Sequence, residues 1–386
     1  MSGIPRDAAA LYGPPVTSWF DELTPAHVRN LDVYQPGKPI EELERELGIT
    51  GAIKVASNEN PLGASPKALA ALPDALANLH LYPDAGGFAL RRALATRFDL
   101  PIGAIALGNG SNDLLYQLVL ATTDPTDEVL THKYAFLSYR LAAQVAGRAF
   151  VASAVTPDYG CDVDALIAAI TPRTKLVVLG TPNNPTGSVI TRADAAKVLA
   201  ALPARAVLVI DEAYAEYAAE WPEVEHVDGL ALQREDRRVI VLRTFSKIYG
   251  LAGIRIGFAV ADPAVIDVLG RVGRTFHVSS LAQTAAIAAL DDTEHLAASA
   301  RHARTQIERL RSEIKTPGVR VFSSLANFVL IDCGRASGPV YDKLLRAGVI
   351  VRPMAAWGLP SCIRVSVARD AELSRVISAV NDVLGT

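Results

Sequence analysis

Residues 207–214 read Val-Leu-Val-Ile-Asp-Glu-Ala-Tyr, four apolar residues that end abruptly in two carboxylates. A continuous apolar run of this kind is typical of a strand buried on both faces, as in a parallel α/β sheet. Patterns typical of helices separate this run from five others, at 105–107, 129–131, 176–179, 239–242 and 256–260. The alternation predicts a doubly wound α/β sheet with helices on both faces, and Asp211 at the carboxyl end of one strand.

The pattern changes near Glu294, where one long helix from His295 to about Ile314 is predicted. Short strands follow, at 319–322, 327–332, 349–352 and 363–367. We therefore expect three parts. They are an N-terminal arm at 1–57 that packs on the small domain or a partner subunit, a large domain at 58–290, and a small α+β domain at 291–386.

The composition excludes several classes of protein. Half of the 386 residues are apolar, and 38 basic side chains stand against 41 acidic ones. A formal charge of −3 leaves no basic surface for nucleic acid, and no stretch nears the roughly 18 uncharged apolar residues of a membrane span. The three cysteines are widely spaced and the chain starts without an apolar signal segment, which favours reduced thiols, no metal site and a cytoplasmic protein.

The loop at 181–187 reads Thr-Pro-Asn-Asn-Pro-Thr-Gly and directly follows the predicted strand 176–179. Ligands bind at the carboxyl ends of strands in open α/β sheets, and Asn184 offers a neutral donor and acceptor there. Taken alone, an ordinary Asn/Pro/Gly turn is the simpler interpretation.

The loop after strand 239–242 gathers cationic and hydroxyl groups. Residues 243–257 read Arg-Thr-Phe-Ser-Lys-Ile-Tyr-Gly-Leu-Ala-Gly-Ile-Arg-Ile-Gly. Two hydroxyls, Lys247 and Arg255 around one glycine-rich turn favour a phosphate site. A desolvated Lys247 is a nucleophile that can form a Schiff base, whereas an exposed loop lysine is the simpler alternative. Asp211, if buried, needs a cationic partner.

A second anion site is indicated at 108–113, which read Gly-Asn-Gly-Ser-Asn-Asp before a predicted helix at 114–121. Glycines allow close backbone approach, and a helix N-terminus binds anions. Asp113 stands where a dinucleotide fingerprint has its third glycine, which argues against a nicotinamide site and leaves a phosphate site open.

Taken together, a phosphate held by hydroxyls and an arginine, beside a lysine and a buried carboxylate, fits pyridoxal 5′-phosphate. At this point the sequence resembles the PLP-dependent fold-type-I (class II) aminotransferases, in the histidinol-phosphate aminotransferase branch. The markers run from about Tyr34 to Val367. Besides the runs above, they are Ser-Asn-Glu-Asn-Pro at 57–61, Tyr-Pro-Asp at 82–84, Ala-Asn-Phe at 326–328, Arg352 and Arg364. The resemblance implies a mainly parallel seven-stranded sheet in the large domain, a smaller C-terminal domain, and a homodimer with shared active sites.

The resemblance also implies roles for individual residues. Lys247 would bind the cofactor as a Schiff base and then move a proton at the substrate. Asp211 would face the pyridine nitrogen, while Asn184 and Tyr214 would contact the 3′-oxygen of the ring. Four residues would hold the cofactor phosphate: Ser111, Asn112, Ser246 and Arg255. Tyr82 would reach the phosphate from the neighbouring subunit.

One aromatic side chain is expected to stack on the cofactor ring. Phe136 matches the family best, Tyr139 is a second aromatic, and Tyr134 is a competitor. Packing of Phe136 in the core is an equally good interpretation.

For the substrate, Arg364 resembles the arginine that binds a carboxylate, and Arg352 matches a second anion site. Tyr34 matches a tyrosine that helps to hold a substrate phosphate. These residues favour transamination between histidinol phosphate and 2-oxoglutarate. An aromatic amino-acid aminotransferase and a decarboxylase of a phosphorylated amino acid, such as threonine phosphate, stay open as alternatives.

Overall fold

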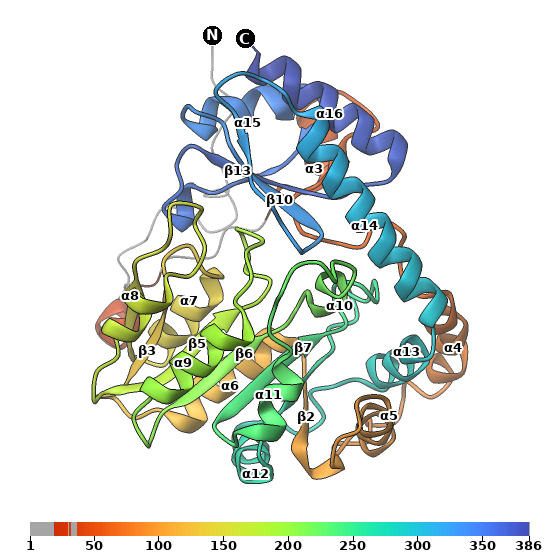
Figure 1. The fold of residues 1–386 in the computed structure, drawn as a ribbon. Helices are drawn as coiled ribbons and strands as arrows, with labels where there is room; N and C mark the ends of the chain where they lie inside the picture. Colours follow the sequence, from red (N-terminus) through yellow and green to blue (C-terminus); the bar gives the residue numbers. More distant parts are fainter. Residues whose placement is uncertain (1–18, 30, 32–36, 386) are drawn as a thin grey trace.

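A computed structural model describes residues 19–29, 31 and 37–385, and a seven-stranded sheet forms the centre of its larger part (Figure 1). The strand order is β2-β8-β7-β6-β5-β3-β4, and all neighbours are parallel except the two pairs that include β8. The strands are β2 (Ile105–Gly108), β3 (Glu128–His132), β4 (Ala149–Ser153), β5 (Thr174–Gly180), β6 (Val207–Asp211), β7 (Val239–Thr244) and β8 (Gly257–Val260). The predicted α/β fold with a mainly parallel seven-stranded sheet is confirmed.

Two strands differ from the expectation. β8 belongs to a continuous apolar run but lies antiparallel to β2 and β7, because residues 245–256 form a loop without the crossover helix that a parallel return requires. β4 was not predicted from its apolar pattern. It is one of the two edge strands, and only Ser153 of its residues is buried, although residues 149–152 are all apolar.

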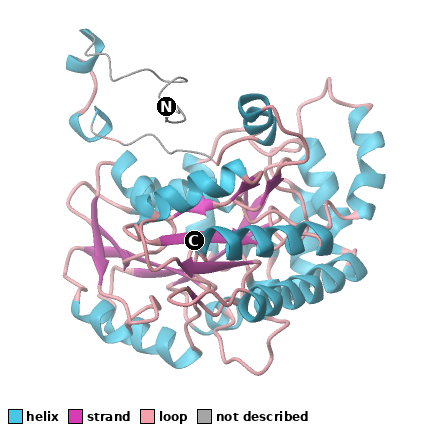
Figure 2. Ribbon diagram, turned by 90° about the horizontal axis from the view of Figure 1, so that it is seen from above, coloured by secondary structure: helices cyan, strands magenta, loops and turns pink. Residues whose placement is uncertain are grey.

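Alternate residues of each strand pack into two separate cores, one on each face of the sheet. On β5, Leu176 and Val178 join one core, while Val177 and Leu179 join the other. Seen from above, the strands lie between layers of helices (Figure 2). The first face is covered by α6 (Ser111–Thr122), α7 (Leu137–Val145) and α12 (Pro263–Val272). The second core takes in α5 (Phe88–Phe98), α8 (Val163–Ala168), α9 (Arg192–Ala201), α11 (Gly229–Glu235) and α13 (Ser280–Leu290), and α4 (Pro66–Leu76) packs on α13.

The C-terminal part is built on a four-stranded antiparallel sheet of order β12-β13-β10-β9. Its elements are α14 (Thr293–Glu313), β9 (Arg320–Val321), β10 (Phe328–Asp332), α15 (Ser337–Arg346), β12 (Arg352–Pro353), β13 (Cys362–Ser366) and α16 (Asp370–Leu384). The strand predicted at 349–352 is divided between two sheets. Its first half is β11 (Val349–Ile350), which pairs in parallel with β1 (Ile53–Lys54), and its second half is β12. The proposed domain limits stay a prediction.

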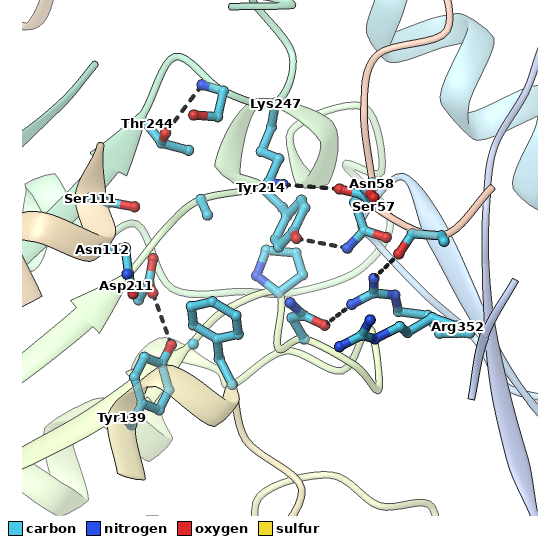
Figure 3. A pocket seen from close by; sticks show the side chains of 18 of the residues that line it. Ser57, Asn58, Ser111, Asn112, Tyr139, Asp211, Tyr214, Thr244, Lys247 and Arg352 are labelled. Carbon is cyan, nitrogen blue, oxygen red and sulfur yellow. Dashed lines mark hydrogen bonds between the residues drawn. The ribbon is translucent and has the colours of Figure 1, made fainter. Parts of the chain in front are cut away.

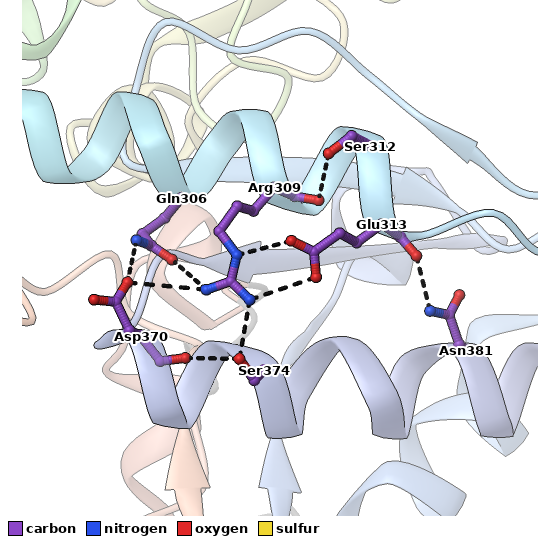
Figure 4. A network of polar contacts seen from close by, with 7 residues as sticks. All are labelled: Gln306, Arg309, Ser312, Glu313, Asp370, Ser374 and Asn381. Carbon is purple, nitrogen blue, oxygen red and sulfur yellow. Dashed lines mark hydrogen bonds and ion pairs between the residues drawn. The ribbon is translucent and has the colours of Figure 1, made fainter.

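Helix α14 runs beside both parts in Figure 1 and packs on α16. A polar network joins the two helices (Figure 4), with Arg309 of α14 donating to Glu313 at 2.8 Å and to Ser374 of α16 at 2.9 Å. The short remaining elements are η1 (Trp19–Glu22), α2 (Ala26–Arg29), α3 (Ile40–Leu47), η2 (Ile102–Ala104), α10 (Ala215–Ala218) and η3 (Ala355–Trp357).

Candidate functional site

A cavity of about 220 Å³ lies at the carboxyl ends of the central strands, where β12, β13 and η3 also contribute to its wall (Figure 3). All predicted site residues except Tyr34 and Tyr82 line it: Ser111, Asn112, Phe136, Asn184, Asp211, Tyr214, Ser246, Lys247, Arg255, Arg352 and Arg364. They come from segments more than 250 residues apart in the chain. The fold thus brings the separate motifs to one place.

Asp211 is buried at the end of β6, and its two oxygens are in different situations. Oδ2 accepts a 2.9 Å hydrogen bond from the hydroxyl of Tyr139, which is buried on α7. Oδ1 is also buried but receives no hydrogen bond from any described residue. Burial raises the pKa of Asp211 to about 6, and the bond from Tyr139 opposes that rise. A cationic N–H placed at Oδ1 would stabilise the carboxylate.

Lys247 follows β7 and lies with its amine buried in the same cavity. Its Nζ donates to the carbonyl of Ser57 at 3.4 Å and lies 5.8 Å from the centre of the Tyr214 ring. The Tyr214 hydroxyl in turn accepts a 2.9 Å bond from the side chain of Asn58. Burial, and then the positive charge of Arg364, lowers the pKa of Lys247 to about 8. A sizeable fraction of this amine is therefore neutral, and nucleophilic, near physiological pH.

The N-terminus of α6 and the loop after β7 form a narrow cup. Arg255 donates to Ser246 Oγ at 3.2 Å and to the carbonyl of Asn109 at 3.4 Å. Gly110, the residue before α6, has a φ of +91°, and a Cβ there would lie 2.6 Å from Arg255 Nη2. A Cβ on Gly257 would lie 2.4 Å from the backbone nitrogen of Ser111. Only glycines leave this cup open, and its hydroxyl, guanidinium and helix N–H groups suit a phosphate.

Two arginines face each other on the opposite wall. Arg352 of β12 and Arg364 of β13 are direct cross-strand partners, and both are buried. Arg364 donates to Asn184 Oδ1 at 2.5 Å and to the carbonyl of Ala56 at 2.6 Å. The Arg352 guanidinium lies over the Trp357 ring, 5.4 Å from its centre. Like charges directly opposite each other repel, so this wall favours an anionic ligand.

Of the three aromatic candidates, the cavity is lined by Phe136 and Tyr139 and not by Tyr134. The Phe136 and Tyr139 rings meet edge to face at 5.7 Å, and the Tyr139 hydroxyl is bonded to Asp211. Tyr134 contacts Tyr159 instead, with ring centres 5.2 Å apart. The stacking role itself stays a prediction.

Two predicted residues lie elsewhere. Tyr34 falls outside the described residues. Tyr82 is 82% exposed and stacks on Phe276 with ring centres 4.6 Å apart, away from the cavity. Its contact with a partner subunit stays a prediction.

The sequence reasoning missed several cavity contacts. The sequence pattern predicts only a ring contact for Tyr139, yet its hydroxyl donates a hydrogen bond to Asp211. Ser57 and Asn58 stand out in the sequence only as part of a motif, and no sequence signal marks Trp357, yet all three line the cavity. Asn327, part of the Ala-Asn-Phe motif, donates to the carbonyls of Asn58 and Glu59 at 3.0 and 3.3 Å and so fixes this segment.

Within the described ranges, no group of three or more His, Cys, Asp or Glu side chains could hold a metal ion. Among the helices of those same ranges, none is long and apolar enough to cross a membrane. Cys161, Cys333 and Cys362 are free thiols.

Comparison with known proteins agrees with the resemblance to aminotransferases seen in the sequence. The sequence profile of the family "Aminotransferase class I and II" matches residues 50–380. A histidinol-phosphate aminotransferase of an Anaeromyxobacter species is 44% identical over 364 residues, which cover 94% of this chain and 99% of that protein. A second enzyme of that name, from Pseudomonas aeruginosa, is 45% identical over 92% of this chain and 96% of its own length. The solved histidinol-phosphate aminotransferase of Sinorhizobium meliloti, in complex with pyridoxal 5′-phosphate, aligns with a TM-score of 0.83 at 30% identity, covering 94% of this chain and 97% of that one.

Proposed function

Because the chain belongs to the class I and II aminotransferase family, we propose that it is a pyridoxal-phosphate-dependent histidinol-phosphate aminotransferase. It would move the amino group of histidinol phosphate to 2-oxoglutarate, giving imidazole acetol phosphate and glutamate, as a step of histidine biosynthesis. The observation that carries this substrate assignment is the cross-strand pair of Arg352 and Arg364 in the wall of the cavity.

The residues of the cavity fit pyridoxal 5′-phosphate. The unbonded Oδ1 of Asp211 would accept from the protonated pyridine nitrogen. The cup formed by Ser246, Arg255 and the N-terminus of α6 would hold the phosphate. Asn184 and Tyr214 would contact the ring oxygen, and Phe136 would stack on the ring. When bound, this cofactor supplies a carbonyl that takes up the amino group and a ring that withdraws electrons.

Lys247 is the group that we propose moves the proton. Its pKa of about 8 leaves a basic amine that can take a proton from Cα of the amino donor. In the reverse half-reaction the same amine would give a proton to Cα of the amino acceptor. The buried position excludes bulk water, and the contact with the Ser57 carbonyl holds the amine toward the cavity. A side chain without an amine at this position could not perform the transfer.

Two arginines in one cavity would let it accept both substrates in turn. Arg364 would bind the carboxylate of glutamate or 2-oxoglutarate bidentately. Arg352 would take the distal anion, which is a phosphate in histidinol phosphate and a carboxylate in glutamate. We expect Tyr34 to add a contact to the substrate phosphate.

A screen of single half-reactions tests the substrate. The cofactor-loaded protein is mixed separately with histidinol phosphate, phenylalanine, tyrosine, threonine phosphate and glutamate, and the change of cofactor absorbance is followed. We expect histidinol phosphate and glutamate to react fastest. Faster reaction with phenylalanine would make the protein an aromatic aminotransferase, and carbon dioxide released from threonine phosphate would make it a decarboxylase.

The proposal includes a homodimer in the cytoplasm. Exposed apolar side chains gather on α4, α5 and the segments beside them, which supports a covered face: Leu76, Leu79, Leu81, Tyr82, Phe88 and Phe276. Tyr82 would then reach the cofactor phosphate of the partner. Sedimentation of the purified protein tests the dimer, and activity regained on mixing inactive Lys247→Ala and Tyr82→Ala proteins tests the shared site.

A further inference from the structure

A second cavity, of about 360 Å³, lies beside the cofactor cavity and shares part of its wall. It is lined by the end of β3, the start of α7, part of β4 and the turn around η3. Phe136 and Trp357 line both cavities. A molecule that fills the second cavity would therefore contact two side chains that also face the first.

The charge of this second cavity is positive. Lys133 and Arg140 line it, and its described lining contains no Asp or Glu. Neither cationic side chain forms a hydrogen bond or ion pair with any residue in the described part of the chain. Arg140 Nε is buried, and no described residue accepts a hydrogen bond from it. A buried N–H without an acceptor is destabilising, and an anion in the cavity would supply one.

The remaining walls are flat and mostly apolar. They carry the aromatic rings of Tyr134, Phe136, Phe150 and Trp357. The buried His132 contributes an imidazole whose Nδ1 lies 2.7 Å from the carbonyl of Lys133. Because burial lowers the pKa of His132 to about 4, the ring is neutral. Its proton must then sit on Nδ1 to bond the carbonyl, which leaves Nε2 as an acceptor.

We propose that this second cavity binds a small planar organic anion, an aryl or heteroaryl phosphate or carboxylate, through Lys133 and Arg140. Its ring would lie against the aromatic walls, while its anionic group would bind the two cationic side chains. Through Phe136 and Trp357 its occupation would slow transamination without competing for Arg352 and Arg364. That effect on the rate rests on the proposed function, whereas the binding does not.

Calorimetric titration of the cofactor-loaded protein with phenyl phosphate tests the binding. Phenyl phosphate can also reach the arginines of the first cavity, so the titration is repeated on Arg352→Gln. We expect binding to persist in Arg352→Gln and to weaken about tenfold or more in the double variant Lys133→Gln/Arg140→Gln, since charge-assisted hydrogen bonds are lost. The matched control removes two exposed cations elsewhere, Lys197 of α9 and Arg311 of α14, and leaves the affinity unchanged.

Unchanged affinity in the double variant, or loss of binding in Arg352→Gln, would overturn the proposal, because the probe would then occupy only the first cavity. Thermal unfolding and the cofactor absorbance verify that each variant is folded. If the double variant does not fold, the titration is made on Lys133→Gln alone. This side chain is exposed, so its substitution should not disturb the fold. In the wild type we expect phenyl phosphate to lower kcat, and purely competitive inhibition against histidinol phosphate would contradict the coupling. The calorimetric result is independent of which substrate the enzyme turns over, so failure of the proposed function would be seen separately.

Discussion

Asp211 and Glu212 are neighbours in the chain and are both buried, yet they belong to two different regions. Alternation along β6 turns Asp211 to the face of the sheet that α6 and α7 cover, where Val209 also packs, and Glu212 to the opposite face. Glu212 accepts from Arg243 at 2.9 and 2.7 Å and from the backbone of Gly229 at 2.6 Å. Asp211 keeps one buried oxygen without a hydrogen bond from the described residues.

We call Asp211 and Lys247 the cavity side and Glu212 and Arg243 the paired side. On the paired side the charges satisfy each other, and burial is tolerated because each has its partner. On the cavity side burial shifts the pKa of Asp211 up and that of Lys247 down, which leaves both groups ready for a ligand. The difference predicts that changes on the cavity side reduce activity, whereas changes on the paired side reduce stability.

The largest expected effect is that of Lys247→Ala. Removal of the amine should lower the rate of transamination by about 10⁴-fold or more, as for other residues that act directly on the reacting atoms. Stability should change little. The measurement is single-turnover absorbance with histidinol phosphate, with thermal unfolding as the control. Substantial activity in Lys247→Ala would show that the amine is not needed for the reaction, and the catalytic role of the cavity side would be wrong.

Glu212→Gln should have the largest effect on stability. It leaves the buried Arg243 without its closest acid, and breaking a buried pair in this way costs about 3–5 kcal/mol. Glu216 also interacts with Arg243, which places the expected loss at the lower end of that range. Denaturant unfolding measures it, with Glu235→Gln in an exposed pair as the matched control. An unchanged unfolding free energy would contradict the structural role of the paired side.

Asp211→Asn should make the cofactor-free protein more stable at high pH. The folded pKa of Asp211, about 6, lies above its unfolded value, so the folded state binds its proton more tightly. The wild type therefore loses stability as the pH rises from about 4 to 6, by roughly 3 kcal/mol from this group, and stays lower above pH 6. Asn cannot ionise, so the advantage of the variant should appear above pH 6 and vanish near pH 4. A difference that does not depend on pH would disprove the assignment.

How far the sequence predicts these regions depends on the range of each interaction. The buried strands and the position of Asp211 and Lys247 after them follow from local apolar runs, which the sequence displays directly. The bond from Asn58 to Tyr214 joins residues 156 positions apart, and no local pattern indicates it. The direction of β8 and the division of 349–352 between two sheets likewise depend on packing partners that only the folded chain provides. The carboxyl-end motifs are predictable because strand geometry fixes their place, whereas the polar partners around them are not.

Tyr139→Phe should have a smaller effect, confined to the cavity side. The Tyr139 hydroxyl lowers the pKa of Asp211 by donating to its charged form, so its removal should raise that pKa further. The decline in stability of the cofactor-free protein should then extend to higher pH, while its start, which the unfolded state sets, stays in place. Phe136→Leu, which removes a ring but no hydrogen bond, is the control. A midpoint that moves downward would contradict the contact.

Arg309→Ala should have the smallest effect, and it separates burial from pairing. Arg309 and Glu313 form the same kind of ion pair as Arg243 and Glu212, but they lie on the surface between α14 and α16 (Figure 4). Water screens the exposed pair, so its loss, with that of the bonds to Gln306 and Ser374, should cost no more than about 1 kcal/mol. Comparison of the unfolding free energies of Arg309→Ala and Glu212→Gln in one buffer makes the test. If both variants lost the same stability, the pairing itself and not the burial would explain the paired side, and the contrast with Asp211 would lose its physical basis.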